Sequence, residues 1–238
     1  MIGIALITGA SRGIGREIAQ YFAAAGYSLI LLARTAETLE DVAADLRSAF
    51  NVEVITLPLD IRNHTSVRDA VATAVHEARR LDVLVNAAGI FRYGTSVLSM
   101  EDLDDLLETN VKGVHNLCTV CAEALRTSAG HVFNISSIVG LEGFAPVGGY
   151  AASKFALVGY GQSLGKEFLE YGVKVTTLCP DVVDTDMAAS SGLPLEKMIA
   201  REDITRAIDF VMSLSPAAIV DQITIKCRTM EEIMNVRK

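Results

Sequence analysis

Tyr150 and Lys154 lie in the stretch GGYAASKFALVGYGQS, residues 148–163, which is otherwise made mostly of small or apolar residues. Residues four apart on a helix face the same side, with Cβ atoms about 5–6 Å apart. The spacing therefore predicts a phenol beside an ammonium, and a nearby cation stabilises a phenolate and lowers its pKa. Acid–base chemistry is one interpretation. The other is chance, because many surface helices contain such a pair.

A second candidate site follows the first apolar run of the chain. The segment TGASRGIGREIAQ, residues 8–20, places Gly9, Gly13 and Gly15 between a predicted strand and a predicted helix. Glycines at this point allow a sharp turn and let a pyrophosphate approach the helix N-terminus, where free N–H groups and the dipole favour negative charge. The pattern indicates a dinucleotide site, although glycine-rich loops also occur as ordinary turns and the spacing is not G-x-G-x-x-G.

The end of the second predicted strand indicates which dinucleotide would bind. An acidic residue there would hold the ribose 2′-hydroxyl of NAD, whereas an arginine accommodates the 2′-phosphate of NADP. This chain has Arg34, and Arg12 within the glycine loop could supply a second guanidinium. We predict NADP(H) as the preferred cofactor, with NAD(H) possible. Two solvated surface arginines are the alternative.

These residues must be positioned by a scaffold, and the chain alternates short Ile-, Val- and Leu-rich runs with amphipathic segments. That alternation predicts an α/β fold: a single-domain, doubly wound (Rossmann-type) parallel sheet of about seven strands with helices on both faces. Strands are expected near residues 2–7, 27–33, 52–57, 82–86, 131–136, 173–179 and 219–226. Helices are expected near residues 14–25, 36–49, 65–80, 101–127, 149–171 and 202–213. One domain would span residues 1–238, with a small substrate lid near 188–201.

Composition limits the class of partner. The 238 residues carry a formal net charge of −8, with a pI near 5.0. Nucleic acids and anionic membranes need a positive field, so neither is expected as a partner. No apolar run reaches the 18 residues of a membrane-spanning helix, and the first run is too short for a signal peptide, which predicts a cytoplasmic protein. No metal site is predicted, because His64, His76, His115 and His131 are scattered.

Polar segments also follow the later predicted strands. They are NAAG at residues 86–89, NISS at 134–137 and CPDVVDTDM at 179–187. Ligands of open parallel sheets bind beyond the carboxyl ends of the strands, so these segments should face the same crevice as the glycine loop. A glycine-rich loop joins Ser137 to Tyr150, which would let a hydroxyl and a phenol converge.

Together these motifs resemble the short-chain dehydrogenase/reductase family. The set is Thr8-Gly9-x-x-x-Gly13-x-Gly15, Asn86-Ala87-Ala88-Gly89, Asn110, Ser137 and Tyr150-x-x-x-Lys154, spread in this order over nearly the whole chain. The resemblance implies that Tyr150 gives a proton to a carbonyl oxygen as a hydride arrives from the nicotinamide. It also implies that Lys154 tunes Tyr150 and holds the nicotinamide ribose, that Ser137 donates to the oxyanion, and that Asn110 helps to hold a water in a proton relay.

The resemblance further implies a set of binding residues. The cofactor contacts would be Gly9, Ser11, Arg12, Gly13, Ile14, Gly15, Arg34, Asp60, Ile61, Asn86, Ala87, Gly89, Tyr150, Lys154, Pro180, Val183 and Thr185. Among them Asp60 would contact the adenine region, Asn86 would steady the central strand, and Thr185 would lie near the nicotinamide carboxamide. Substrate contacts would be Ser137, Tyr150, Phe91, Tyr93 and Phe144.

Two features of the chain leave alternatives open. Asp181 stands where relatives usually have glycine, and its carboxylate would either attract a cationic substrate or point away and cap the next turn. Small residues recur at helical spacing at Ala152, Ala156, Gly159 and Ser163. They indicate close packing with a second copy, in a homodimer or homotetramer, or packing within the chain against the sheet.

The function predicted is the reversible NADPH-dependent reduction of a ketone or aldehyde to an alcohol, with a small carbonyl or alcohol compound as the substrate. NAD-linked oxidation of a sugar or polyol is one alternative, and a non-catalytic cofactor-binding regulator of the same fold is another. The intact set of Ser137, Tyr150 and Lys154 favours an enzyme over a regulator.

Overall fold

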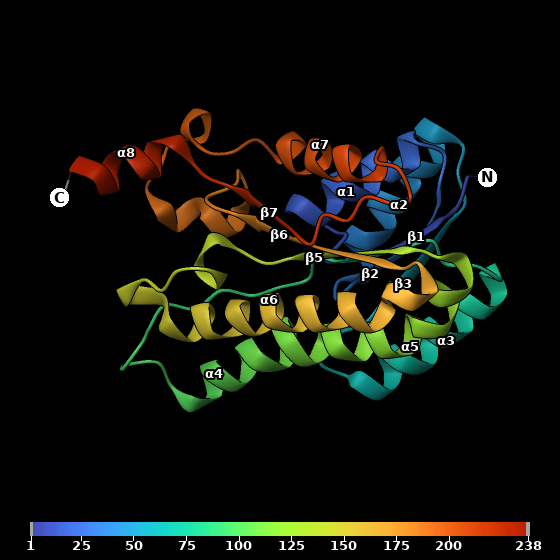
Figure 1. The fold of residues 1–238 in the computed structure, drawn as a ribbon, viewed down its shortest axis with the longest axis horizontal. Helices are drawn as coiled ribbons and strands as arrows, with labels where there is room; N and C mark the ends of the chain where they lie inside the picture. The colour runs from blue at the N-terminus through green and yellow to red at the C-terminus, as the bar shows by residue number, and fades with distance from the viewer. Residues whose placement is uncertain (1, 237–238) are drawn as a thin grey trace.

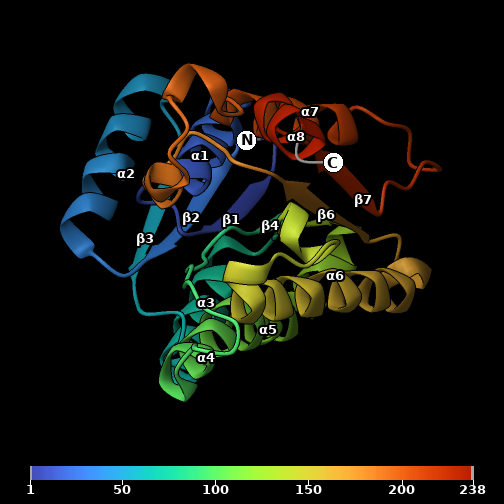
Figure 2. The same cartoon turned by 90° about the vertical axis from the view of Figure 1, so that its left-hand side faces the viewer.

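The computed structural model describes residues 2–236. Its strands form one seven-stranded sheet in the order β3-β2-β1-β4-β5-β6-β7, and every neighbouring pair is parallel (Figures 1 and 2). The strands are β1 Ile4–Thr8, β2 Ser28–Ala33, β3 Val54–Pro58, β4 Val83–Asn86, β5 His131–Ile135, β6 Lys174–Pro180 and β7 Gln222–Ile225. The direction of winding reverses between β1 and β4. A crevice at their carboxyl ends is therefore the expected ligand site.

The central strands are buried on both faces. Every residue of β1, β2, β4 and β5 is buried, whereas β3 and β7 at the two edges are partly exposed. Continuous apolar runs of this kind suit a parallel sheet covered by helices on both sides. The predicted fold class and the predicted order of strands and helices are confirmed.

Helices form one layer on each face of the sheet (Figure 2). The helices α1, α2, α7 and α8 lie on one face, and α3, α4, α5 and α6 lie on the other. Their bounds are α1 Gly13–Ala24, α2 Ala36–Phe50, α3 His64–Ala78, α4 Met100–Leu107, α5 Gly113–Ser128, α6 Gly148–Phe168, α7 Arg201–Met212 and α8 Arg228–Val236. Two apolar clusters fill the space between the sheet and its layers, one on each face. No helix of the described residues is long and apolar enough to cross a membrane.

Two helices differ from the sequence prediction. The single helix expected at 101–127 is interrupted by a π-helical turn at Glu108–Lys112, which separates α4 from α5. Asn110 lies in that turn, and its side chain forms hydrogen bonds with the backbone N–H and the carbonyl oxygen of Ile90, outside its own helix. The change of helical pitch therefore coincides with a side-chain contact between this helix and the segment after β4. A π turn within a helix often marks a functional site. The C-terminal helix α8 was not predicted.

The predicted lid segment consists of short turns. Two 3₁₀ turns, Asp186–Ser191 and Leu195–Lys197, lie in this region, and most of their residues are exposed. Tyr93 reaches the first turn, where its hydroxyl lies 3.1 Å from Ser190 Oγ. Opening and closing of this segment stays a prediction.

The stripe of small residues on α6 faces away from the sheet. Ala152, Ala156, Gly159 and Ser163 are all exposed. The opposite side of the helix packs on the sheet, where a Cβ on Gly161 would lie 2.5 Å from Thr177 Oγ1. Packing within the chain against the sheet therefore does not explain the stripe.

Candidate active site

The glycine loop after β1 has the backbone of an anion site. Gly9 and Gly13 have φ angles of +66° and +54°, in the left-handed region that favours glycine. A Cβ on Gly15 would lie 2.3 Å from the carbonyl oxygen of Gly9, so the loop can turn back on α1 only with glycine there. Arg12 at the N-cap makes no side-chain capping bond to the first turn of α1. The loop thus fits the phosphates of a dinucleotide, which free N–H groups at a helix start bind well.

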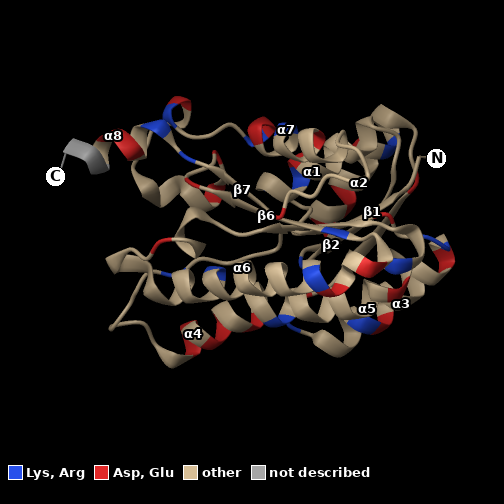
Figure 3. Cartoon of the chain, viewed as in Figure 1, with Lys and Arg blue, Asp and Glu red and all other residues tan. Residues whose placement is uncertain are grey.

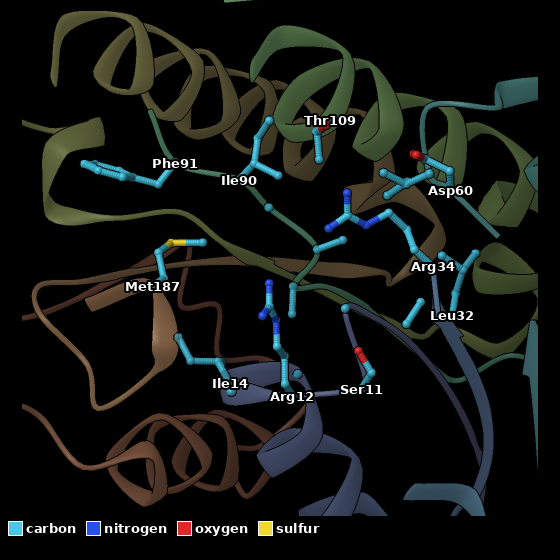
Figure 4. Close-up of a pocket in the computed structure, with 18 of the residues that line it drawn as sticks. Ser11, Arg12, Ile14, Leu32, Arg34, Asp60, Ile90, Phe91, Thr109 and Met187 are labelled. Atoms are coloured by element: carbon cyan, nitrogen blue, oxygen red, sulfur yellow. The ribbon is translucent and has the colours of Figure 1, made fainter. Parts of the chain in front are cut away.

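A cavity of about 600 Å³ opens beside this loop (Figure 4). Most of the predicted cofactor residues line it, namely Gly9, Ser11, Arg12, Gly13, Ile14, Gly15, Arg34, Asp60, Ile61, Ala87, Gly89 and Thr185. The predicted substrate residue Phe91 lines it as well. Residues drawn from the glycine loop and from the ends of β2, β3, β4 and β6 therefore meet around one space.

The remaining predicted cofactor residues lie outside the wall of this cavity. Pro180 at the end of β6 and Val183 just after it are buried, and Tyr150 and Lys154 on α6 are buried as well. Asn86 is buried in the sheet, where its Nδ2 donates to Asn134 Oδ1 at 2.8 Å across the β4–β5 pair. The structure thus places Asn86 where it can hold two central strands together.

Two guanidiniums enter the cavity from different elements. Figure 4 shows Arg12 rising from the start of α1 and Arg34 extending from the end of β2. Arg12 forms an exposed ion pair with Asp186, in which Nη1 lies 3.4 Å from Oδ2. An exposed pair contributes only about 0–1 kcal/mol to stability. Arg12 is therefore free to exchange this carboxylate for an anionic ligand.

The cavity wall also carries a residue that the sequence analysis missed. Arg62 lines the cavity next to Asp60 and forms ion pairs with Asp60 and Asp105. Hydrogen bonds from Arg62 hold the pKa of Asp60 below its usual range, with a smaller contribution from the charge of Arg34. Arg92 and Thr109 also line the cavity and were not predicted. The sequence could have identified Arg62 as a cavity residue only because it follows the predicted cofactor residue Asp60 by two positions.

The phenol and the ammonium predicted on α6 both point inward. Tyr150 is 8% exposed and Lys154 is 5% exposed. Lys154 Nζ lies 5.6 Å from the centroid of the Tyr150 ring and donates to the carbonyl oxygen of Ile135 at 2.9 Å. A Cβ on Gly140 would lie 2.8 Å from the carbonyl oxygen of Lys154, so the loop after β5 can approach α6 this closely only with glycine there.

Burial shifts the pKa values of both groups. It raises the pKa of Tyr150 to about 12, while hydrogen bonding with Ser137 acts in the opposite direction. It lowers the pKa of Lys154 to about 8. Desolvation disfavours the charged form of either group. The chain alone therefore does not make the phenol acidic, and the ammonium is close to losing its proton at mildly alkaline pH.

Asn110 connects the π turn to the same site. Its Oδ1 accepts a hydrogen bond from the backbone N–H of Ile90 at 2.9 Å, and its Nδ2 donates to Ser153 Oγ at 3.0 Å. A Cβ built on Gly89 would lie 3.4 Å from Asn110 Oδ1 and 3.6 Å from Lys154 Nζ. Asn110 and Lys154 thus both approach Gly89 closely. That Asn110 holds a water stays a prediction.

Aromatic side chains form a wall beside the phenol. The ring of Phe91 lies 5.0 Å from that of Tyr150 and 4.7 Å from that of Tyr93, both in edge-to-face geometry. Phe144 packs against the small apolar cluster that includes Tyr150. Phe91 and Tyr93 therefore lie together beside Tyr150, and Phe144 packs near the same cluster. Tyr93 is 56% exposed.

Asp181 does not face the cavity. Its Oδ2 accepts a hydrogen bond from the backbone N–H of Cys227 at 3.2 Å, at the junction between β7 and α8. Burial raises the pKa of Asp181. The carboxylate therefore caps the adjacent turn, which supports the second of the two alternatives for Asp181. A role in attracting a cationic substrate stays untested.

Known proteins with similar sequences are oxidoreductases. The family profile described as short chain dehydrogenase matches residues 3–195. The oxidoreductase UcpA of Salmonella typhimurium is 40% identical over 190 residues, which are 78% of this chain and 71% of that protein. A 3-oxoacyl-[acyl-carrier-protein] reductase, FabG, of Chlamydia trachomatis is 31% identical over 231 residues, covering 92% of this chain and 93% of its own.

A solved structure extends the likeness to the whole fold. An alcohol dehydrogenase from the archaeon Thermococcus sibiricus, complexed with 5-hydroxy-NADP, superimposes with a TM-score of 0.89 at 29% identity. The match covers 95% of this chain and 97% of the archaeal one. With the profile match over residues 3–195 and the 40% identity to UcpA, this chain is an oxidoreductase that belongs to the short chain dehydrogenase family.

Proposed function

We propose that the protein is an NADPH-dependent oxidoreductase that reversibly reduces a ketone or aldehyde to an alcohol, with Tyr150 as the general acid and base. The observation that carries this proposal is the proximity of Ser137, Tyr150 and Lys154 to one another and to two residues of the cavity wall: Phe91 packs against Tyr150, and Gly89 lies close to Lys154. Bound NADPH would supply the hydride. The preference for NADPH is supported by Arg12 and Arg34 in the cavity wall and by the NADP analogue bound to the structural relative from Thermococcus sibiricus.

Each residue of the cluster has a separate task in this proposal. Tyr150 donates its proton to the carbonyl oxygen, which becomes the hydroxyl oxygen of the product. Ser137 donates a hydrogen bond to the same oxygen as negative charge develops there. Lys154 keeps a positive charge beside the phenol, which favours the phenolate left after proton transfer.

The burial of Tyr150 determines when its proton can leave. With a pKa near 12 the phenol stays protonated over the physiological range, which suits a proton donor in the reductive direction. The oxidative direction needs the phenolate. We expect the positive nicotinamide of the oxidised complex, together with Lys154, to lower the pKa of Tyr150 for that direction.

The shape of the site favours a moderately apolar substrate. Phe91 and Tyr93 present ring carbons beside Tyr150, and Phe144 packs near the same apolar cluster. A 3-oxoacyl thioester is a second candidate, because the similarity to the FabG protein of Chlamydia trachomatis extends over 92% of this chain. The acidic net charge of −8 disfavours an acidic carrier protein as the partner.

We also propose that the protein assembles as a homodimer or homotetramer through α6. The exposed stripe of small residues lies beside Phe155, whose ring is exposed in the single chain. Glycine in a helix interior costs about 1 kcal/mol relative to alanine, and a close helix contact at Gly159 would offset that cost. Light scattering that gives a monomer at micromolar concentration would rule out this assembly.

The proposed reaction is tested by following NADPH absorbance with a panel of ketones, aldehydes, sugars and a simple 3-oxoacyl thioester. Tyr150→Phe keeps the ring contact with Phe91 and removes the proton. We expect turnover to fall by about 10²- to 10⁴-fold with the affinity for NADPH kept. Tyr171→Phe makes the same change at an exposed residue outside the cavity and is the matched control, which should stay within about threefold of wild type. Near-normal turnover in Tyr150→Phe, or no reduction of any compound, would refute the proposal.

A further inference from the structure

Lys154 is bound to the end of β5 through both its side chain and its backbone. Its Nζ donates to the carbonyl oxygen of Ile135 at 2.9 Å, and its own carbonyl oxygen accepts a hydrogen bond from Ser136 Oγ at 3.1 Å. Ile135 is the last residue of β5, and Ser136 follows it directly. Ser136 is 3% exposed and Lys154 is 5% exposed. Two consecutive residues at the end of one strand therefore hold the backbone and the tip of the same lysine.

The hydroxyl of Ser136 uses a lone pair that the helix leaves free. Lys154 lies within α6, where helical bonding takes one lone pair of its carbonyl oxygen, and a carbonyl oxygen carries two. The loop after β5 packs closely on this additional bond, because a Cβ on Gly140 would lie 2.7 Å from Ser136 Oγ and 2.8 Å from the Lys154 carbonyl oxygen. Loss of the hydroxyl would therefore leave the helical bonding intact and would release one contact between Lys154 and the strand.

The ammonium of Lys154 lies among neutral groups. Charged residues lie mainly on the helices and loops, and the central strands are mostly free of them (Figure 3). Within residues 2–236, the titratable groups recorded near Lys154 are the Tyr150 phenol of α6 and the Cys179 thiol of β6. Burial raises the pKa of Tyr150 to about 12 and that of Cys179 to about 11, so both stay uncharged while Lys154 titrates. The π turn contributes Asn110, whose amide does not titrate.

We propose that Ser136 is a positioning residue, which holds the Lys154 backbone against β5 so that Nζ stays on the Ile135 carbonyl oxygen beside the phenol. The inference rests on the proposed function, in which Lys154 keeps a positive charge next to Tyr150. It adds to Ser137, Tyr150 and Lys154 a fourth residue, which acts through the ammonium and not on the substrate.

Loss of the Ser136 hydroxyl should make Lys154 lose its proton at lower pH. A hydrogen bond from Nζ to a carbonyl oxygen favours the ammonium over the amine, because the charged group is the stronger donor. Once the backbone of Lys154 is released, Nζ spends less time at Ile135, and the pKa of Lys154 falls. We expect the midpoint of its titration to fall by about 0.5–1 pH unit in Ser136→Ala.

The titration of Lys154 can be followed directly by NMR of protein that carries ¹³C-labelled lysine. Lys154→Arg lacks one of the resonances and thereby assigns it. Ser136→Ala should lower the midpoint as stated above. Ser136→Cys fills the same space with a weaker donor, so it should lower the midpoint by a smaller amount, and it carries the test if the alanine variant does not fold. The measurement needs neither substrate nor turnover.

Ser128→Ala is the matched control. Ser128 Oγ also donates to backbone carbonyl oxygens, those of Leu81 and Leu125, and it lies before the amino end of β5, at the opposite end of the strand from Ser136. This variant loses a bond of the same kind without releasing Lys154. Its Lys154 midpoint should stay within about 0.2 pH unit of wild type.

Activity should change in a pH-dependent way. We expect kcat/KM for NADPH in Ser136→Ala to stay within about twofold of wild type at about pH 6 and to lie about two- to fivefold below it at about pH 8. The reason is that the lower midpoint reduces the charged fraction of Lys154 only at the higher pH. Structural damage alone would lower the ratio by the same factor at both pH values.

Three results would overturn the inference. One is a Lys154 midpoint that equals the wild-type value in both Ser136 variants, and another is an equal shift in Ser128→Ala. The third is a loss of kcat/KM in Ser136→Ala that is the same at both pH values. If the midpoint falls in the Ser136 variants while wild type reduces no carbonyl compound, the placement of the ammonium by Ser136 stands and only the proposed reaction fails.

Discussion

The ammonium of Lys154 lies 5.6 Å from the centre of the Tyr150 ring and donates a hydrogen bond to the carbonyl oxygen of Ile135 at 2.9 Å. The end of β5 therefore fixes the position of the cation beside the phenol. This anchoring keeps the two groups close although the burial of each disfavours its charged form. In the proposed reaction, proton transfer would depend on that geometry, and a pH dependence would follow from it.

Lys154 should set an upper pH limit for activity. In the free enzyme its pKa is about 8, so the ammonium is lost as the pH rises through this value. Tyr150, with a pKa near 12, keeps its proton over the same range. We expect kcat/KM for NADPH to be level below about pH 7 and to fall above about pH 8, because this ratio reports ionisations of the free enzyme. Lys154→Arg, which stays charged, should move the fall to higher pH; a wild-type profile that stays level to pH 10 would contradict the assignment.

Arg34 should determine the choice between NADPH and NADH. Arg34→Asp replaces a group that attracts the 2′-phosphate with one that repels it. We expect the ratio of kcat/KM for NADPH to that for NADH to fall by about a hundredfold, since charge-assisted hydrogen bonds are each worth about 1.5–3 kcal/mol. Arg68→Asp makes the same charge change outside the cavity and should leave the ratio unchanged. A ratio that does not move in Arg34→Asp would remove Arg34 from cofactor selection.

Asp181 should affect folding rather than substrate preference. Asp181→Ala leaves the backbone N–H of Cys227 without its acceptor and should lower the free energy of unfolding by about 1 kcal/mol relative to Asp181→Asn. The asparagine keeps an oxygen for this bond and removes a charge that burial disfavours, so it should be at least as stable as wild type. Urea unfolding measures both variants. A changed preference between cationic and neutral ketones in either variant would show that the carboxylate acts on the substrate.

His131 should make the fold sensitive to acid. Thr176 Oγ1 donates to the carbonyl oxygen of Val220 at 2.6 Å, so it accepts from the neutral His131 ring, whose Nε2 lies 2.9 Å away. Burial lowers the pKa of His131 to about 3. Between about pH 6.5 and 3 the unfolded chain therefore binds more protons than the folded protein. The stability associated with the neutral ring is fully present above about pH 6.5 and is lost as the pH falls through this window.

This sensitivity is measured by urea unfolding at pH 7 and pH 5. We expect wild type to lose about 2 kcal/mol more than His131→Gln, at up to about 1.4 kcal/mol per pH unit. The variant lacks the titrating ring and serves as the control. Equal losses in the two proteins would show that His131 is not the group responsible.

The sequence by itself determined the fold class and the main part of the cavity. Apolar runs as in β1 and β2 predict buried parallel strands, because such runs can be buried only between two layers of helices. The sequence could likewise assign the glycine loop and Arg34 to the cavity, because the backbone freedom of glycine and the charge of arginine are properties of the residues themselves. The spacing of Tyr150 and Lys154 likewise predicted two groups on one helical face, and in the structure they lie close to Phe91 and Gly89 of the cavity wall.

Only the tertiary structure decided how distant residues meet. The partners of Asn110, of Asp181 and of Arg62 lie 20, 46 and 43 residues away along the chain. The π turn at Glu108–Lys112, the turn capped by Asp181 and the orientation of the Arg62 guanidinium all depend on those partners. The pKa of Tyr150 also depends on the tertiary structure. Desolvation raises it, and desolvation depends on all the groups that pack around the phenol, whereas the spacing in the sequence identifies only Lys154 as a neighbour.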